Sequence, residues 1–420
     1  FISLILVASV TVCAQSQDRW TILQDGSIQW KPTRNLPHED HVEMSGQMLS
    51  VVLRYGVDVQ QRFHLNRSLV FPMLRMKPNK TQNNLKQRFD VNIPAMVTVD
   101  DQTLLNEVVQ DITFNGIMRV ESDYGYIYRR KELKNAIHVT RILYPSINAP
   151  RYLEEYTFKN NSQNPITLRV PEWRVTYTTP EEAGVYGAYR IEASLSKKGA
   201  FILKPGETLD FYAIYSGKKV SDDVTEKDNT AFSRITIQSE RAGRQALINQ
   251  WWENLVLDTP DPVLNRMFAF AKLRGAESIY RTKGGLMHGP GGEAYYAAVW
   301  ANDQAEYINP FFPFLGYDIG NESALNAYRH FARYMNPEYN PIPSSIISEG
   351  VSFWHGAKDR GDGAMIAYGA ARYALARGDK EEARELWPLI EWCLEYCKRK
   401  LTPDGVVASN SDELENRFPA

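Results

Sequence analysis

The chain has 420 residues and nearly balanced charge, with 48 Lys and Arg against 50 Asp and Glu and a formal net charge of -2 at pH 7. This length gives room for about two or three domains and for a large hydrophobic core. Because the charges cancel and Lys and Arg form no long run, we exclude a surface that follows the phosphates of a nucleic acid.

The chain opens with FISLILVASVTVCAQ, an apolar run that is too short to span a bilayer. The run ends in Val12-Cys13-Ala14, which fits the small-residue rule for cleavage of a secretory signal. We therefore expect residues 1–17 to be a signal peptide and the mature chain, without a membrane span, to be secreted or periplasmic. The stretch has no initiator Met and no basic segment, so we expect the signal to be incomplete. A lipoprotein signal would use Cys13, but Val12 is a poor residue before a lipidated cysteine.

Neither the cysteines nor the short polar clusters predict a metal or a cofactor. Cys393 and Cys397 lie one turn apart on a predicted helix, which favours free, buried thiols over a disulfide. Residues 38–41 (HEDH) carry metal-binding side chains, but no second cluster completes a coordination shell, so we expect a polar loop there. The glycine run at 284–292 lacks the Lys-Ser/Thr pair of a phosphate loop.

The first half of the chain has the period of β-strands. From Trp20 to Tyr215, short apolar alternations are separated by Gly, Pro, Asn and Asp, which predicts an antiparallel β-sandwich over residues 18–235. GYIYRRKELKNAIHVTRILY indicates a long hairpin, and LKPGETLDFYAIY indicates a turn that leads into a late strand.

After about Asp223 the period becomes helical. We expect a linker helix in residues 236–257 and a helical domain over 258–420, whose first helix starts at Thr259 and Pro260. Further helices are expected within residues 302–312, 321–335, 361–378 and 380–401, with Gly378 ending the third of these four. The link after Gly378 is short, whereas the loops before 299, before 360 and after 401 are long and rich in Gly, Pro, Trp and His. This alternation predicts a ring of helical hairpins with a site on the long-loop side.

Three segments on that side resemble motifs of the six-hairpin glycosidase superfamily, which includes glucoamylases, trehalases and α-L-rhamnosidases. VWANDQA (299–305) resembles the W-x-R-D-x-A motif that opens the second barrel helix, with Asn302 in place of the usual Arg. SFWHGAKDRGDGAMIAYG (352–369) resembles the aromatic loop and helix start before the fourth helix. SNSDELENRF (409–418) follows the fifth helix, where this superfamily holds its general acid.

The resemblance implies an N-terminal antiparallel β-sandwich followed by the first half of an (α/α)6 toroid. A complete toroid needs about twelve helices, whereas this sequence predicts five or six. We therefore expect the chain to be truncated inside the barrel. In this superfamily the catalytic base comes from a late loop, which we expect to lie outside the chain.

Glycoside hydrolysis needs one carboxylic acid to protonate the leaving oxygen and a second carboxylate to activate water or to attack the sugar. The resemblance implies that Glu413 is the general acid, with Glu415 close behind. Burial beside like charge, which Asp412 would supply, can keep such an acid protonated. The alternative interpretation of this cluster is a solvated acidic loop.

Sugars are bound by aromatic faces and by hydrogen bonds from carboxylates to hydroxyls. Asp303 starts a predicted helix, whose backbone amides favour its ionised form, so we expect it to hold sugar hydroxyls; the alternative is a helix cap. Trp354 is expected to stack on a sugar or to fill the gap between two helices. The remaining expected substrate contacts are Trp300, His355, Asp362, His288, Glu293 and Tyr296.

These features predict an exported glycoside hydrolase that cleaves oligo- or polysaccharides, with inversion because most relatives of this barrel invert. Two alternatives stay open. One is a polysaccharide lyase that uses Tyr295, Tyr296 or His355 as base and Arg or Asn to neutralise a uronate. The other is a carbohydrate-binding protein without catalysis. The sugar, the linkage and the oligomeric state are not specified by the sequence.

Overall fold

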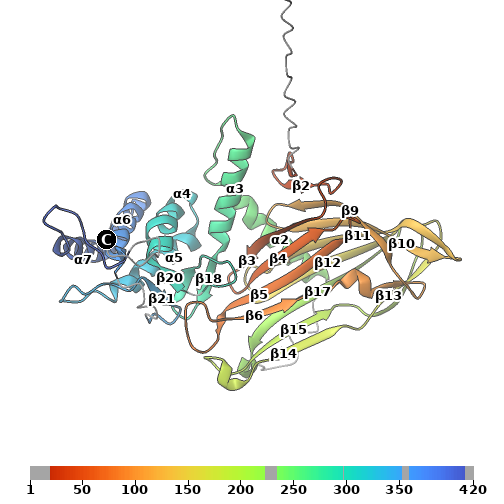
Figure 1. Ribbon diagram of the computed structural model, residues 1–420, viewed down its shortest axis with the longest axis horizontal. Helices are drawn as coiled ribbons and strands as arrows, with labels where there is room; N and C mark the ends of the chain where they lie inside the picture. The colour runs from red at the N-terminus through yellow and green to blue at the C-terminus, as the bar shows by residue number, and fades with distance from the viewer. Residues whose placement is uncertain (1–18, 223–233, 297, 352–358, 412–420) are drawn as a thin grey trace, which may run out of the picture.

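A computed structural model of the chain describes residues 19–222, 234–296, 298–351 and 359–411 (Figure 1). An antiparallel β region comes first and a group of helices lies beside it, in the order that the sequence predicts. The prediction of a β-sandwich followed by part of an (α/α)6 toroid is confirmed. None of the helices in the described ranges is long and apolar enough to cross a membrane.

The largest sheet has nine strands and forms the back layer in Figure 1. Hairpins join most neighbours, as period-two sequences with short turns favour. The predicted hairpin at 125–144 is confirmed, since β10 and β11 pair antiparallel up to a turn at Arg129 and Arg130. In sheet order the strands are β1 (Thr21–Ile22), β2 (Ile28–Trp30), β9 (Leu105–Phe114), β10 (Met118–Tyr128), β11 (Lys131–Pro145), β12 (Arg151–Asn160), β17 (Thr208–Lys219), β15 (Tyr189–Leu195) and β14 (Arg174–Thr178).

A second sheet of four strands packs against the large one, and their facing side chains form one hydrophobic core. Arg67 on this sheet donates to Glu154 on the large sheet at 3.0 Å, so these two buried charges of the core are paired with each other. Residues 38–41, expected to form a polar loop, instead begin a strand, because His41 pairs with Arg54 in register. The strands are β3 (His38–Ser45), β4 (Ser50–Val57), β5 (Phe63–Arg75) and β6 (Asn84–Phe89).

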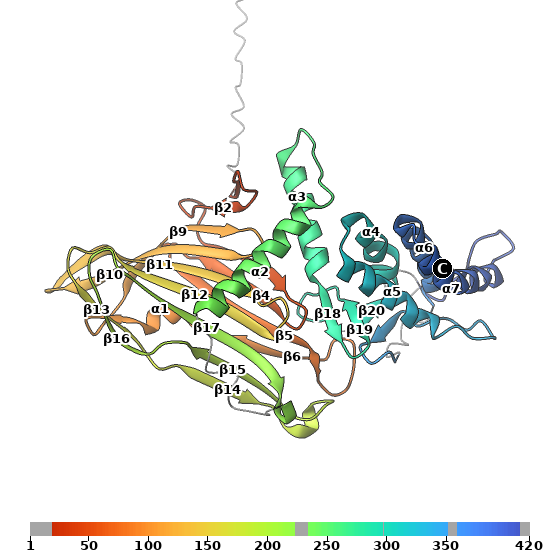
Figure 2. The same cartoon turned by 180° about the vertical axis from the view of Figure 1, so that it is seen from behind.

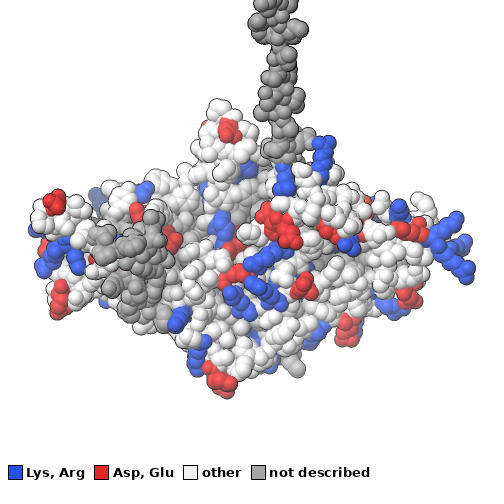
Figure 3. Space-filling view, in the orientation of Figure 1, with Lys and Arg blue, Asp and Glu red and all other residues white. Residues whose placement is uncertain are grey.

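A smaller sheet closes one end of the sandwich and shares its core. Its strands are β16 (Gly199–Leu203), β13 (Ile166–Val170), β7 (Thr98–Val99) and β8 (Gln102–Thr103). The β region also contains the short helix α1 (Ile93–Met96), just before β7, and 3-10 turns at Glu181–Ala183 and Val220–Asp222. On the face seen in Figure 3, basic and acidic side chains are interspersed, without a broad area of one sign.

The helical part is built from elements whose ends carry recognisable caps. Helix α3 starts two residues later than predicted, because Asp261 caps it by accepting from the amides of Val263 and Leu264. Gly378 ends α6 with φ of 65°, as predicted, and Asp379 caps α7. The helices are α2 (Arg234–Glu253), α3 (Pro262–Glu277), α4 (Phe312–Leu315), α5 (Asp318–Ala332), α6 (Asp362–Arg377) and α7 (Lys380–Arg399).

Two short strand pairs lie among these helices: β18 (Ile279–Thr282) with β19 (Gly285–His288), and β20 (Ala298–Trp300) with β21 (Ser345–Ile347). The helix expected over residues 302–312 differs from a regular α-helix. It is a π-helix at Ala301–Ile308, followed by a 3-10 turn at Asn309–Phe311. Of the described cysteines, Cys393 is buried and Cys397 is half-buried, and both are free, as expected.

Helix α2 lies across the outer face of the large sheet, where Figure 2 shows it crossing β12 and β17. Ile237 and Ile248 of this helix are buried in the same cluster as Tyr144 and Leu153 of the sheet and as the helical core. One continuous apolar core therefore joins the sheet, α2 and the later helices, and it fixes the helical part against the sandwich.

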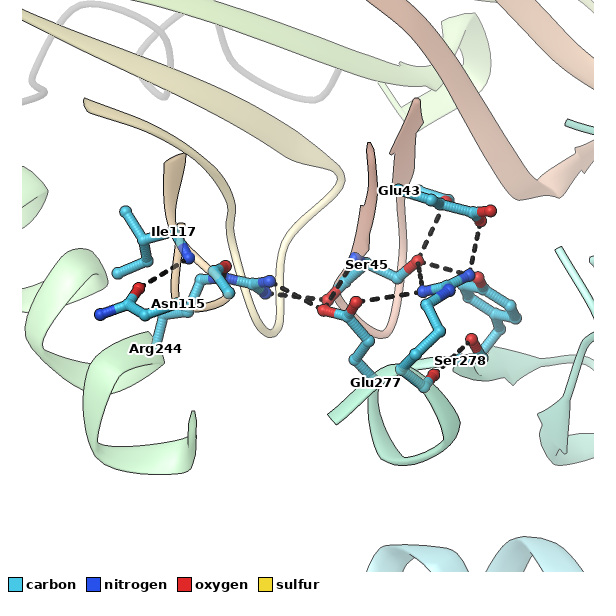
Figure 4. A network of polar contacts seen from close by, with 11 residues as sticks. Glu43, Ser45, Asn115, Ile117, Arg244, Glu277 and Ser278 are labelled. Atoms are coloured by element: carbon cyan, nitrogen blue, oxygen red, sulfur yellow. Dashed lines mark hydrogen bonds and ion pairs between the residues drawn. The ribbon is translucent and has the colours of Figure 1, made fainter. Parts of the chain in front are cut away.

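A buried polar network joins the two parts at a second place (Figure 4). The Glu277 carboxylate at the end of α3 accepts from Arg244 of α2 at 2.7 Å, from Arg274 at 3.1 Å and from the Ser45 amide of β3 at 3.1 Å. Arg274 also pairs with Glu43 at 2.6 Å. Glu277 and Arg244 are almost fully buried, so this carboxylate links three elements away from water.

Candidate functional site

The opening of the π-helix places Trp300 and Asp303 at one pocket. Strand β20 ends at Trp300, opposite Ser345 of β21, and the Ala301 amide donates to the Ser344 carbonyl at 3.0 Å. Gln304 fixes this junction, because its buried side chain contacts the Trp300 amide and donates to the His288 carbonyl at 2.6 Å. Wide π-turns of this kind are frequent at functional sites.

The pocket has a volume of about 620 Å³, which lies in the range that small ligands occupy. Tyr295 and Trp300 meet edge to face in its wall, with ring centroids 5.5 Å apart. Asp303 is exposed there, in the first turn of the π-helix. The lining residues are Lys80, Thr81, Gln82, Asn83, Pro290, Tyr295, Trp300, Asn302, Asp303 and Arg360.

Asp362 lies one layer behind this wall. Its carboxylate is 1% exposed and accepts from Ser344 Oγ at 3.0 Å, while its other oxygen is 3.9 Å from Nη2 of the wall residue Arg360. Burial raises the pKa of Asp362 from 3.8 to about 6, although Arg360 opposes that shift. Asp362 was expected to contact sugar hydroxyls. It is instead buried behind the pocket wall and contacts residues of that wall.

This pKa shift makes a stability prediction. The folded protein holds the Asp362 proton more tightly than the unfolded chain, so the stabilisation is complete below about pH 4 and is lost as pH rises through about 6. Melting temperatures measured across this interval should fall for the wild type relative to Asp362→Asn, which cannot ionise. If the melting temperatures of the two proteins changed in parallel with pH, the raised pKa of Asp362 would be contradicted.

Three other expected contacts point away from this pocket. Gly291, Gly292 and Glu293 all have positive φ, so the chain reverses direction after Pro290. A Cβ at Gly291 would come within 2.9 Å of the Glu43 carboxylate, so this turn requires glycine. After this reversal Tyr295 lines the pocket, whereas Glu293 and Tyr296 do not.

Glu293, Tyr296 and His288 occupy those other positions. Glu293 pairs with Arg54 at 2.6 Å and with Arg88 at 3.1 Å. The hydrogen bond from Arg54 is the main reason why the pKa of Glu293 falls to about 2. Glu293 lines a different cavity, of about 480 Å³. Tyr296 is fully buried, and its hydroxyl accepts from the Glu293 amide at 2.6 Å. Burial lowers the pKa of His288 to about 3, and its ring packs near Phe312.

Four expected site residues, Trp354, His355, Glu413 and Glu415, lie outside the described residues. The described ends of their two loops nevertheless meet. The Asn410 amide donates to the Asp359 carbonyl at 2.8 Å, and Tyr396 of α7 contacts the Asp359 carboxylate. The next residue, Arg360, belongs to the pocket wall. The described residues that flank these loops, Asp359 and Asn410, thus lie next to Arg360 in the wall of the pocket that holds Trp300 and Asp303.

Sequence reasoning missed several residues of this site. The sequence offers Tyr295 only as one aromatic residue of a long loop and as a possible base, and no local pattern distinguishes it from Tyr296. Gln304 and Arg360 are part of the motif-bearing segments, but their roles depend on contacts that only the fold creates. Residues 80–83 belong to the turn between β5 and β6 of the sandwich, more than two hundred positions before Trp300.

Comparison with known proteins bears on the fold. No family model matches the chain, and no curated protein matches it. Among solved structures, it is similar to a protein named provisionally as a kojibiose phosphorylase, from the human microbiome, with TM-score 0.54, 10% identity and 92% of this chain covered. The two chains share a fold. This chain spans 61% of that protein's length. A bacterial glucoamylase in complex with acarbose also matches, with TM-score 0.34, 9% identity, 88% of this chain and 69% of that chain.

Proposed function

We propose that this protein is a glycoside hydrolase that acts on oligo- or polysaccharides. The observation that carries the proposal is that Trp300, Tyr295 and Asp303 line one pocket of about 620 Å³. Such a pocket offers apolar faces for a sugar ring and a carboxylate for its hydroxyls, which are the two features that a hydroxylated ring requires. The resemblance of residues 299–305 to a six-hairpin glycosidase motif supports the same function.

In this proposal Glu413, with Glu415 as its nearest competitor, donates a proton to the glycosidic oxygen as the bond to the anomeric carbon breaks. Water supplies the hydroxyl that replaces the leaving sugar, and inversion requires a second carboxylate to take the proton of that water. Support for Glu413 comes from the Asn410–Asp359 hydrogen bond, which starts its segment at the edge of the pocket.

Replacing Asp303 by Asn should lower kcat/KM by about 10- to 100-fold, because an amide makes weaker hydrogen bonds to sugar hydroxyls than a carboxylate does. Initial rates on p-nitrophenyl α- and β-glycosides of several sugars measure this. Asp318→Asn is the matched control, since Asp318 is also exposed in the first turn of a helix but lies outside the pocket. Equal rates for wild type and Asp303→Asn on every substrate would refute the proposal.

The same assay identifies the acceptor. The assay is run with and without inorganic phosphate. A hydrolase releases free sugar in both cases, whereas a phosphorylase releases a sugar phosphate and needs phosphate to do so. Proton NMR of the first product shows whether its anomeric centre is inverted, as proposed. If the protein binds sugars but turns over none of the substrates under either condition, it is a carbohydrate-binding protein and the enzymatic proposal is wrong.

A polysaccharide lyase is the second candidate, because Tyr295, Asn302 and Arg360 line the same pocket. In such an enzyme a base removes the proton beside the uronate carboxylate, neutral or cationic donors hold that carboxylate, and the bond to the leaving sugar oxygen breaks to give an unsaturated product. Ultraviolet absorbance of that product from a uronic-acid polysaccharide, lost in Tyr295→Phe, would replace the hydrolase proposal.

We propose further that the protein is exported, by the signal-like residues 1–17, to the periplasm or the medium. The support is the apolar run before Val12-Cys13-Ala14. Fractionation of cells that express the full-length gene should find the processed protein outside the cytoplasm. An unprocessed protein retained in the cytoplasm would contradict this proposal, and labelling with a lipid precursor would reveal a lipoprotein.

A further inference from the structure

The turn that joins β5 to β6 is part of the sandwich, yet it belongs to the pocket of the helical part. Lys80, Thr81, Gln82 and Asn83 line the same space as Trp300 and Asp303. No sequence motif points to this turn. Its side chains are an ammonium, a hydroxyl and two amides, all of which can hydrogen-bond to a sugar.

Two hydrogen bonds hold the turn against the helical part. The Gln82 side-chain amide donates to the Tyr295 hydroxyl at 2.8 Å, and the Asn84 side-chain amide donates to the Ala294 carbonyl at 3.3 Å. Since Tyr295 also packs on Trp300, the turn and the aromatic wall form one continuous surface. A ligand in the pocket would therefore touch both domains.

The turn is also held from inside. Arg75, which is fully buried, donates to Asn84 Oδ1 at 2.6 Å and to Asn79 Oδ1 at 3.1 Å, and it contacts the Lys80 carbonyl. The planar guanidinium fixes the directions of these bonds. The amide of Asn83 adds a bond to the Lys80 carbonyl at 3.0 Å. These bonds restrain the turn and so hold its side chains in place against the pocket.

We propose that this turn selects the sugar that enters the pocket and that Gln82 is a specificity-determining residue. The inference rests on the proposed carbohydrate-active function and goes beyond it. An amide both donates and accepts in fixed directions, so it distinguishes sugars that differ in the orientation of one hydroxyl. The ligand class is a sugar that differs from its epimers at a hydroxyl facing the turn.

The first test compares selectivity. Rates of wild type, Gln82→Ala and Gln87→Ala are measured on p-nitrophenyl glycosides of glucose, galactose and mannose. Gln87 is the matched control, because it lies on β6 outside the pocket and its side chain donates to the neighbouring Arg88 carbonyl. We expect Gln82→Ala to change the ratio of kcat/KM between epimers by about tenfold, with Gln87→Ala unchanged. An unaltered ratio in Gln82→Ala would overturn the inference.

The second test needs no enzymatic activity. In the Asp303→Cys variant, the new thiol reacts with methanethiosulfonate reagents. We measure the rate with a reagent that carries a glucose ring and divide it by the rate with the methyl reagent. We expect this ratio to change several-fold when Gln82→Ala and Asn83→Ala are added, because both side chains line the pocket, and to stay the same with Gln87→Ala. An unchanged ratio shows that the turn does not bound the pocket and overturns the inference. Activity on no glycoside would refute the proposed function, while this ratio would still decide the role of the turn.

Discussion

Replacement of Glu413 by Gln is expected to lower kcat on a substrate with a sugar leaving group by about 10²- to 10⁴-fold. Gln has nearly the same shape as Glu but no acidic proton, so the glycosidic oxygen would have to leave without protonation. Affinity for the sugar should be retained, because the pocket residues Trp300 and Asp303 are unchanged. Steady-state rates and a binding titration on the full-length protein measure the two quantities.

The leaving group makes this prediction sharper. A p-nitrophenolate leaves readily without a proton, so Glu413→Gln should lose much less activity on the p-nitrophenyl glycoside than on the natural linkage. Glu415→Gln is the matched control and should behave as wild type on both substrates. If Glu415→Gln shows the selective loss instead, the general acid is Glu415. If neither variant does, neither Glu413 nor Glu415 is the general acid.

Replacement of Glu277 by Gln is expected to cost about 3 to 5 kcal/mol of unfolding free energy. The change leaves Arg244 buried, 1% exposed, without the opposite charge that now lies 2.7 Å from it. It also weakens the bond from Arg274 and the one from the Ser45 amide, which together join α2, α3 and β3. Urea unfolding followed by tryptophan fluorescence and by circular dichroism measures the loss.

An exposed carboxylate provides the comparison. Glu395 pairs with Arg399 one turn away on α7, with side chains 35% and 54% exposed. Because water screens such a pair, Glu395→Gln should cost less than about 1 kcal/mol. Similar small losses for Glu277→Gln and Glu395→Gln would mean that the network in Figure 4 does not hold the two parts of the molecule together.

The fold was predictable where local period and burial agree. Ile137 and Val139 alternate with His138 and Thr140 along β11, and this period-two pattern alone indicates a strand with one face in a core. Arg141 breaks the pattern because it is buried beside Glu107, at 2.6 Å. The sequence does not indicate this pairing, since Glu107 is 34 positions away.

The site was predictable only for residues within one motif. Trp300 and Asp303 were expected together, and the structure brings them to one pocket because β20 ends where the π-helix begins. Tyr296 and Glu293 were expected there too, but the positive φ angles at 291–293 turn them away. The turn also contacts Glu43, which is distant in the sequence, because the Gly292 amide donates to the Glu43 carboxylate at 3.0 Å. The contribution of residues 80–83 depends likewise on the packing of two domains.

The most direct test of this account is a crystal structure of the full-length protein soaked with the oligosaccharide that it cleaves best. We expect a sugar ring against Trp300, with a hydroxyl within hydrogen-bond distance of the Asp303 carboxylate and another facing Gln82. A sugar bound at a different place, such as the cavity beside Glu293, with the Trp300 pocket empty, would contradict it.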